Sequence, residues 1–192
     1  MLSRTVKHLL ENVLPAARDY FAAEQALSEA YQRNPAAFTA EAQLAKRRAA
    51  EVAIAIDGLA DRAATALTTT PDNVRTQLAP LCAINGVLRD RCIDRICAVA
   101  NAYKHDGPLR AKHPIVSADD ILATGLGYGL DGYGVGKYSG VEVFVSQKDG
   151  TSWKMLGDIP WALAGWFAFL ARQGVTLPEP AYNICNISLP AR

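Results

Sequence analysis

The residues best suited to chemistry lie on one predicted helix, which runs from about Val87 to His105. At about 100° per residue, five polar side chains of this segment fall on one narrow stripe: Asp90, Asp94, Cys97, Asn101 and His105. Carboxylate, amide and imidazole groups placed in this way could transfer a proton or bind a metal ion. The stripe also fits the solvated face of an amphipathic helix, where the helix dipole favours His105 near the C-terminal end. The catalytic candidates on this segment are Asp94, Asn101, Lys104 and His105.

A second candidate site is the glycine-rich segment that precedes a predicted strand. Half of the 14 glycines lie between Gly125 and Gly140, and their backbone N–H groups could cradle a phosphate. The segment leads into a strand and lacks the Gly-Lys-Ser/Thr ending of a phosphate-binding loop, so a bent connection is the alternative interpretation. Tyrosine side chains would supply rigid contact area for recognition. The ligand-binding candidates are Tyr128, Tyr133, Lys137 and Tyr138.

The charge pattern limits the partners that the sequence predicts. A formal net charge of +1 argues against bulk electrostatic capture of nucleic acid or of an anionic membrane. A small basic cluster could still contact the phosphates of a nucleic acid, although a solvated loop explains it as well. Its members are Lys104, His105, Arg110, Lys112 and His113. Zinc-type cysteine spacing, a Glu-x-x-His pair and an HExxH motif are all missing, so no metal and no cofactor are predicted.

Apolar periodicity predicts a single domain of mainly α structure, a bundle of four to five helices with a small β-hairpin inserted before the last helix. The expected parts are a helical bundle (1–106), a glycine-rich loop with the hairpin (115–157), a final helix (158–174) and an extended tail (175–192). Within the bundle, helices are expected over 2–33, 35–67, 71–84 and 87–105. Pro15 is expected to kink or divide the first, and Asn34 to cap the second.

The hairpin is placed by an alternating strand at 141–146, the turn signal Asp149-Gly150 and a returning strand at 152–156. A two-residue turn would set Phe144 opposite Met155 and Ser146 opposite Trp153.

The predicted final helix carries large aromatic side chains on all sides, so it is expected to be buried or to form an interface. The interface candidates, for a second copy or for another protein, are Trp161, Trp166, Phe167 and Phe169. The apolar run 159–171 is too short to span a bilayer, and the N-terminal segment lacks the apolar region of a secretory signal. A cytoplasmic protein without a membrane span is therefore predicted.

Two groups of short motifs make the chain similar to known families. The first group is the helix end Asn101-Ala-Tyr-Lys-His105, preceded by Arg89-Asp90 and Asp94-Arg95, and the second is the pair of repeats Gly127-Tyr128-Gly129 and Gly132-Tyr133-Gly134. This combination resembles uncharacterised bacterial helical-bundle proteins with an Asn-Ala-x-Lys-His helix end, a glycine–tyrosine-rich loop and a hairpin. In order of elements, the resemblance covers roughly residues 41–170.

A more distant likeness is to HEPN-type bundles, many of which are RNases with an Arg-x(4–6)-His motif. No arginine–histidine pair of this chain has that spacing. The pairs that come nearest are Arg4 with His8, Arg95 with His105 and Arg110 with His113. The likeness therefore implies a similar bundle, whereas the catalytic motif is missing from the sequence.

Three functional hypotheses follow from these patterns. The leading one is a non-enzymatic interaction or binding protein, because no complete catalytic set is present. The second is a HEPN-like hydrolase that acts on RNA through the polar stripe. The third is a binder of a small molecule or nucleotide that uses the glycine–tyrosine loop.

The cysteine spacing gives a first testable prediction. Cys92 and Cys97 would lie on one helix with side chains about 140° apart, which rules out disulfide geometry without unwinding. We expect Cys82, Cys92, Cys97 and Cys185 to be reduced, so a thiol titration of freshly purified, denatured protein should count 4 thiols per chain. A Cys92–Cys97 bridge in a mass spectrum would contradict this expectation.

Overall fold

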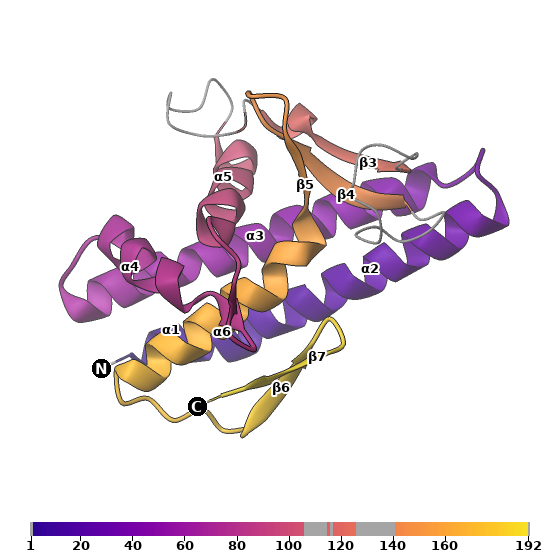
Figure 1. Ribbon diagram of the computed structural model, residues 1–192. Helices are drawn as coiled ribbons and strands as arrows, with labels where there is room; N and C mark the ends of the chain where they lie inside the picture. Colours follow the sequence, from indigo (N-terminus) through magenta and orange to yellow (C-terminus); the bar gives the residue numbers. More distant parts are fainter. Residues whose placement is uncertain (1, 106–114, 116, 126–140, 192) are drawn as a thin grey trace.

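The computed structural model describes residues 2–105, 115, 117–125 and 141–191. Within these ranges the chain is mainly α-helical with small antiparallel strand pairs, so the predicted fold class is confirmed. Two long helices, α2 (Leu14–Arg33) and α3 (Thr39–Leu67), lie side by side along the molecule (Figure 1). Their buried faces are rich in alanine, which allows the two backbones to approach closely.

The chain enters α2 through a short helix, α1 (Ser3–His8), and a π-helical turn, η1 (Leu9–Val13). Pro15 lies directly after this turn, in the first residues of α2. Proline has no N–H to donate within a helix and crowds the preceding turn, and the wider π-helical turn provides the space that its ring needs. The division that the sequence predicts at Pro15 is therefore a local change of helix type.

Two helix boundaries differ from those that the sequence predicts. Asn34 does not cap α3, because its Oδ1 accepts a hydrogen bond from the Ala36 N–H (3.1 Å) in a turn before the helix. Helix α4 (Pro71–Leu78) does not continue to residue 84, because a 3₁₀ turn, η2 (Ala79–Leu81), replaces its last part.

A small hairpin takes the place of the first turn of the predicted fourth helix. Its strands, β1 (Ala83–Ile84) and β2 (Val87–Leu88), are joined by Asn85-Gly86, with φ angles of 51° and 79°. Positive φ at both positions is the type I′ turn that Asn-Gly favours. Helix α5 (Cys92–Lys104) begins only after this hairpin, so Asp90 lies outside the helix and does not belong to the predicted stripe.

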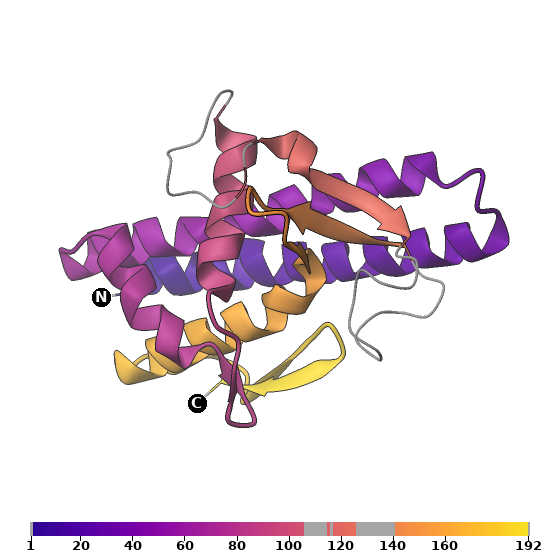
Figure 2. The ribbon, with the colours of Figure 1, turned by 45° about the horizontal axis from the view of Figure 1, so that its top comes forward.

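A three-stranded antiparallel sheet packs on α2 and α3, as Figure 2 shows. A short 3₁₀ turn, η3 (Ala118–Asp120), leads into β3 (Ile121–Gly125), which pairs with β4 (Val141–Ser146), and β4 pairs with β5 (Ser152–Lys154). The hairpin of β4 and β5 confirms the prediction, whereas the sequence does not predict β3.

The register between β4 and β5 differs by one residue from the predicted register. The observed pairs are Phe144–Lys154, Val145–Trp153 and Ser146–Ser152. Gln147 N–H donates to the Thr151 carbonyl (2.8 Å), and Gly150 has a φ of 83°. These features make a three-residue loop, and the extra loop residue shifts every pair of the ladder.

The extended tail predicted at residues 175–192 is not what the structure shows, because a hairpin forms there. Helix α6 (Met155–Arg172) starts directly after β5, and the strands β6 (Ala181–Ile184) and β7 (Ile187–Pro190) follow it as an antiparallel hairpin. Their two-residue turn is Cys185-Asn186, with φ angles of 51° and 64°. Across the described ranges, no helix combines the length and the apolar character that a bilayer span requires.

The aromatic side chains of α6 form the centre of the core. Trp166, Phe167 and Phe169 are each only 1% exposed, so the prediction that they form an interface is wrong: this chain itself covers them with the elements around α6. Trp161 alone reaches the surface, where its Nε1 donates to the Val87 carbonyl (3.2 Å).

A pair of truncations tests this assignment to the core. Phe169 meets Trp166 edge to face, with 5.5 Å between ring centroids, so Phe169→Ala should lower the free energy of unfolding by about 3–5 kcal/mol. Trp161→Ala, in the half-exposed position of the same helix, should lower it by only about 1 kcal/mol. Denaturant unfolding checks both values. If Phe169→Ala kept wild-type stability but changed the mass of an oligomer in solution, the interface prediction would be right after all.

Candidate functional site

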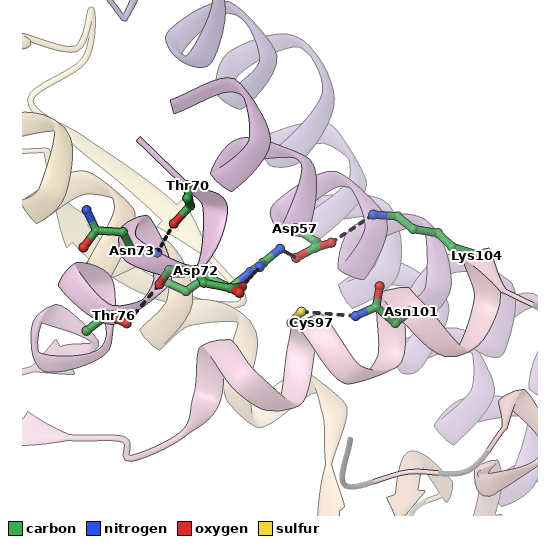
Figure 3. A network of polar contacts seen from close by, with 9 residues as sticks. Asp57, Thr70, Asp72, Asn73, Thr76, Cys97, Asn101 and Lys104 are labelled. Atoms are coloured by element: carbon green, nitrogen blue, oxygen red, sulfur yellow. Dashed lines mark hydrogen bonds and ion pairs between the residues drawn. The ribbon is translucent and has the colours of Figure 1, made fainter. Parts of the chain in front are cut away.

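Two residues of the predicted stripe, Cys97 and Asn101, lie beside a buried carboxylate that the stripe does not contain. Asp57, on α3, is 6% exposed, and each of its oxygens accepts from a cation on a different helix. Arg75 Nη2, from α4, lies 2.8 Å from Oδ1, and Lys104 Nζ, from α5, lies 2.9 Å from Oδ2 (Figure 3). We call this group, with its neighbours Cys97 and Asn101, the Asp57 network.

The start of α4 positions Arg75. The Thr70 side chain caps this helix by accepting from the Asn73 N–H (3.2 Å), and proline occupies the first helical position. One turn into α4, Arg75 also donates Nη1 to Asp72 Oδ1 (2.7 Å). The guanidinium thus lies between an exposed carboxylate and the buried Asp57, which fixes its direction.

The charge state of Asp57 follows from these partners. Burial raises the pKa of this carboxyl group, but the positive charges of Arg75 and Lys104 and their hydrogen bonds outweigh burial and hold it below the usual value. The carboxylate is therefore ionised at neutral pH and is held by two cations. A group in this state is a poor general base, because a proton would have to displace an ion pair.

The cysteine of the network is equally unsuited to nucleophilic attack. Burial raises the pKa of Cys97 to about 12, and the nearby charge of Asp57 adds to the shift. The thiol is therefore protonated at neutral pH. Asn101 Nδ2 donates to its sulfur (3.3 Å), one turn along α5.

The remaining stripe residues lie apart from this network. Asp94 is exposed in the first turn of α5, and His105 is exposed just after its end, where its backbone N–H donates to the Asn101 carbonyl (3.1 Å). Of the four catalytic candidates, the structure brings together Asn101 and Lys104. The glycine–tyrosine candidates Tyr128, Tyr133, Lys137 and Tyr138 lie outside the described residues.

The space beside the Asp57 network is too small for a substrate. The void there has a volume of about 10 Å³ and is lined by Asp57, Arg75, Cys97 and Trp166 among apolar side chains. This volume suits a single water molecule. In the part of the chain that the structure describes, no group of three or more His, Cys, Asp or Glu side chains is placed to hold a metal ion. The network therefore joins helices and offers no reaction chamber.

A second buried carboxylate joins α6 to α5 and to the segment before α5. Asp158 is fully buried in the first turn of α6 and accepts from Arg95 through both oxygens, at 2.7 Å from Nε and 2.8 Å from Nη2. Arg89 Nε donates to the same carboxylate. The guanidinium groups of Arg89 and Arg95 also lie over the rings of Trp161 and Trp153, each 5.5 Å from the ring centroid.

A third buried carboxylate joins α2 to the sheet. Glu24 is fully buried, and its Oε1 accepts from Tyr20 Oη (2.7 Å) and from the Val143 N–H of β4 (3.0 Å). Burial raises the pKa of Tyr20, and the charge of Glu24 raises it further, so the phenol remains a donor. Residue spacing in the sequence did not identify these three carboxylates as buried.

Two open hollows of the described surface lie elsewhere, against residues near both ends of the described chain. One groove, with a volume of about 500 Å³, runs between the start of α2 and the β6–β7 hairpin; we call it the α2–β6 groove. Its lining consists of Leu10, Leu14, Pro15, Arg18, Phe21, Tyr182, Asn183, Ile184, Cys185 and Asn186. A neighbouring hollow of about 420 Å³ shares Leu10 with it. The sequence does not predict this groove, because it does not predict the hairpin that forms one wall.

Comparisons of this chain with protein-family profiles, with curated proteins and with solved structures found no match.

The Asp57 network yields a stability prediction with a matched control. Asp57→Asn should lower the free energy of unfolding at pH 7 by about 3 kcal/mol, because it removes the buried counter-charge that Arg75 and Lys104 share. Asp61→Asn, one turn along the same helix and exposed, should change it by less than about 0.5 kcal/mol. Urea unfolding measures both.

The pH dependence of this difference follows from the lowered pKa of Asp57. A carboxyl group whose pKa is lower in the folded state stabilises that state at pH values above its unfolded pKa, about 4. The advantage of wild type over Asp57→Asn should therefore be complete above that pH and should shrink as the pH falls through the folded-state pKa. A difference that stays constant down to pH 2 would contradict the ion pair.

Proposed function

We propose that this protein is a non-enzymatic binding protein and that the α2–β6 groove receives its ligand. The observation that carries the proposal is the contrast between two spaces: about 500 Å³ in the groove and about 10 Å³ beside the polar network. Ligand pockets commonly measure about 300–1,000 Å³ and have mostly apolar linings with a few polar groups.

The lining of the groove supports this role. Leu10 and Phe21 are half-buried apolar side chains, and neither is among the side chains that pack against the core. They present apolar surface to the groove. Arg18 adds one positive charge, and Asn183 and Asn186 add amides that can orient a ligand.

The polar stripe supports an RNA hydrolase less well. Such an enzyme would need the candidates Asp94, Asn101, Lys104 and His105 around one accessible space, but Lys104 is engaged with Asp57 while Asp94 and His105 lie on the exposed side of α5. The nucleotide-binding role of the glycine–tyrosine loop stays a prediction.

We also propose a cytoplasmic location, which free thiols at all four cysteines support.

A fluorescent anion tests the groove. We expect 8-anilinonaphthalene-1-sulfonate, which combines apolar rings with a negative charge, to bind the folded protein with one site per chain. Phe21→Ala should weaken this binding about tenfold, because one aromatic wall is lost. Phe38→Ala removes an equally half-buried phenylalanine that lies outside the groove and should leave binding unchanged. Equal effects of the two variants, or no binding, would refute the proposal.

A further inference from the structure

The β6–β7 hairpin leaves one strand edge open. Its turn has two residues, so the closing pair Ile184–Ile187 is hydrogen-bonded and the pairs alternate from there. At the other end, the Ala191 N–H donates to the Pro180 carbonyl (3.0 Å), which confirms the alternation. Ala181 and Asn183 therefore occupy positions that are not hydrogen-bonded to β7, and their N–H and C=O groups point away from it.

This open edge faces the α2–β6 groove. Successive side chains of a strand point to opposite faces, and the groove is lined by Tyr182 and Ile184 from one face of β6 and by Asn183 from the other. No residue of β7 lines it. A hollow that touches both faces of one strand, but not the partner strand, runs along the outer edge of that strand.

The two edges of the hairpin differ in their protection. Natural sheets block open edges with proline or charged side chains. The outer edge of β7 carries Pro190, which has no N–H to offer. The strand β6 has neither a proline nor a charged residue within it. Its edge is therefore suited to accept another strand.

The opposite wall adds side-chain complementarity. It presents Leu10, Leu14 and Phe21 together with Arg18, the single charged residue of the lining. Arg18 is exposed, and it forms no hydrogen bond or ion pair with the residues that the structure describes. The groove lining of a second copy would bring another Arg18 and no carboxylate, so an acidic partner fits better.

We propose that the α2–β6 groove binds an extended peptide by strand addition to β6, with a carboxylate of the peptide paired to Arg18. The inference rests on the proposed function and names its ligand class. Backbone groups of the peptide bond to Ala181 and Asn183, whose spacing of two residues, about 6.8 Å, matches an extended chain. Alternate apolar side chains of the peptide pack against Leu10, Leu14 and Phe21.

A proline pair tests the backbone contact. Asn183 and Ser188 are cross-strand partners, and the N–H of each points outward, so proline at either position spares the hairpin ladder. The probe is the fluorescein-labelled peptide Thr-Val-Thr-Val-Thr-Glu, titrated by fluorescence polarisation. Asn183→Pro should weaken its binding about tenfold, and Ser188→Pro should leave it unchanged. Equal loss in both variants, or no loss in either, would overturn strand addition.

Hydrogen exchange and a second peptide test the backbone contact and the charge pairing separately. In the unmodified protein, saturating peptide should slow hydrogen exchange of the Ala181 and Asn183 amides, and unchanged exchange rates would refute the contact even if the proline variants fail to fold. Arg18→Ala should weaken binding of the glutamate peptide but not of the matched peptide ending in glutamine. Equal weakening for both peptides would overturn the charge pairing.

The dye and the peptide together separate the two proposals. Dye binding that is sensitive to Phe21→Ala, without peptide binding, would leave the groove as a ligand site and overturn the peptide as its ligand. Loss of both would overturn both proposals. A dimer in light scattering that Asn183→Pro dissociates and Ser188→Pro does not would show that a second copy occupies the edge instead.

Discussion

The ionised carboxylate of Asp57 is the constraint on which the placement of three helices depends. A charge taken out of water is strongly unfavourable unless cations and hydrogen bonds surround it. Asp57 lies on the face of α3 that packs into the molecule, so its partners must come from other elements. Arg75 and Lys104 satisfy it only if α4 and α5 approach α3 from directions that let both cations reach the same carboxylate.

Two other buried carboxylates also need partners from neighbouring elements. Asp158 connects α6 to Arg89 and Arg95, and Glu24 connects α2 to β4. Apolar packing tolerates small shifts between elements, whereas charged hydrogen bonds demand a defined geometry. The buried polar groups of this protein therefore fix how its elements meet.

Apolar periodicity predicted the existence of the main helices and of the β4–β5 hairpin, but not all of the helix ends or the hairpin register, because it depends only on residues close in the sequence. It could not separate Asp57 from Asp61, since only the packing of α3 decides which one is buried and the partners of Asp57 lie 18 and 47 positions away. The aromatic residues of α6 were predicted to form an interface for the same reason: the elements that cover them are distant in the sequence. Asn85-Gly86, in contrast, was a readable turn signal, and it would have shortened the predicted fourth helix.

The two walls of the α2–β6 groove come from opposite ends of the described chain, at residues 10–21 and 182–186. Contacts between such distant segments close large loops, which costs chain entropy. The groove is therefore incomplete until residues 181–190 have been synthesised and have folded into the β6–β7 hairpin. The buried carboxylates and their partners all precede residue 159, so the growing chain contains its whole ion-paired interior before it contains both walls of the groove.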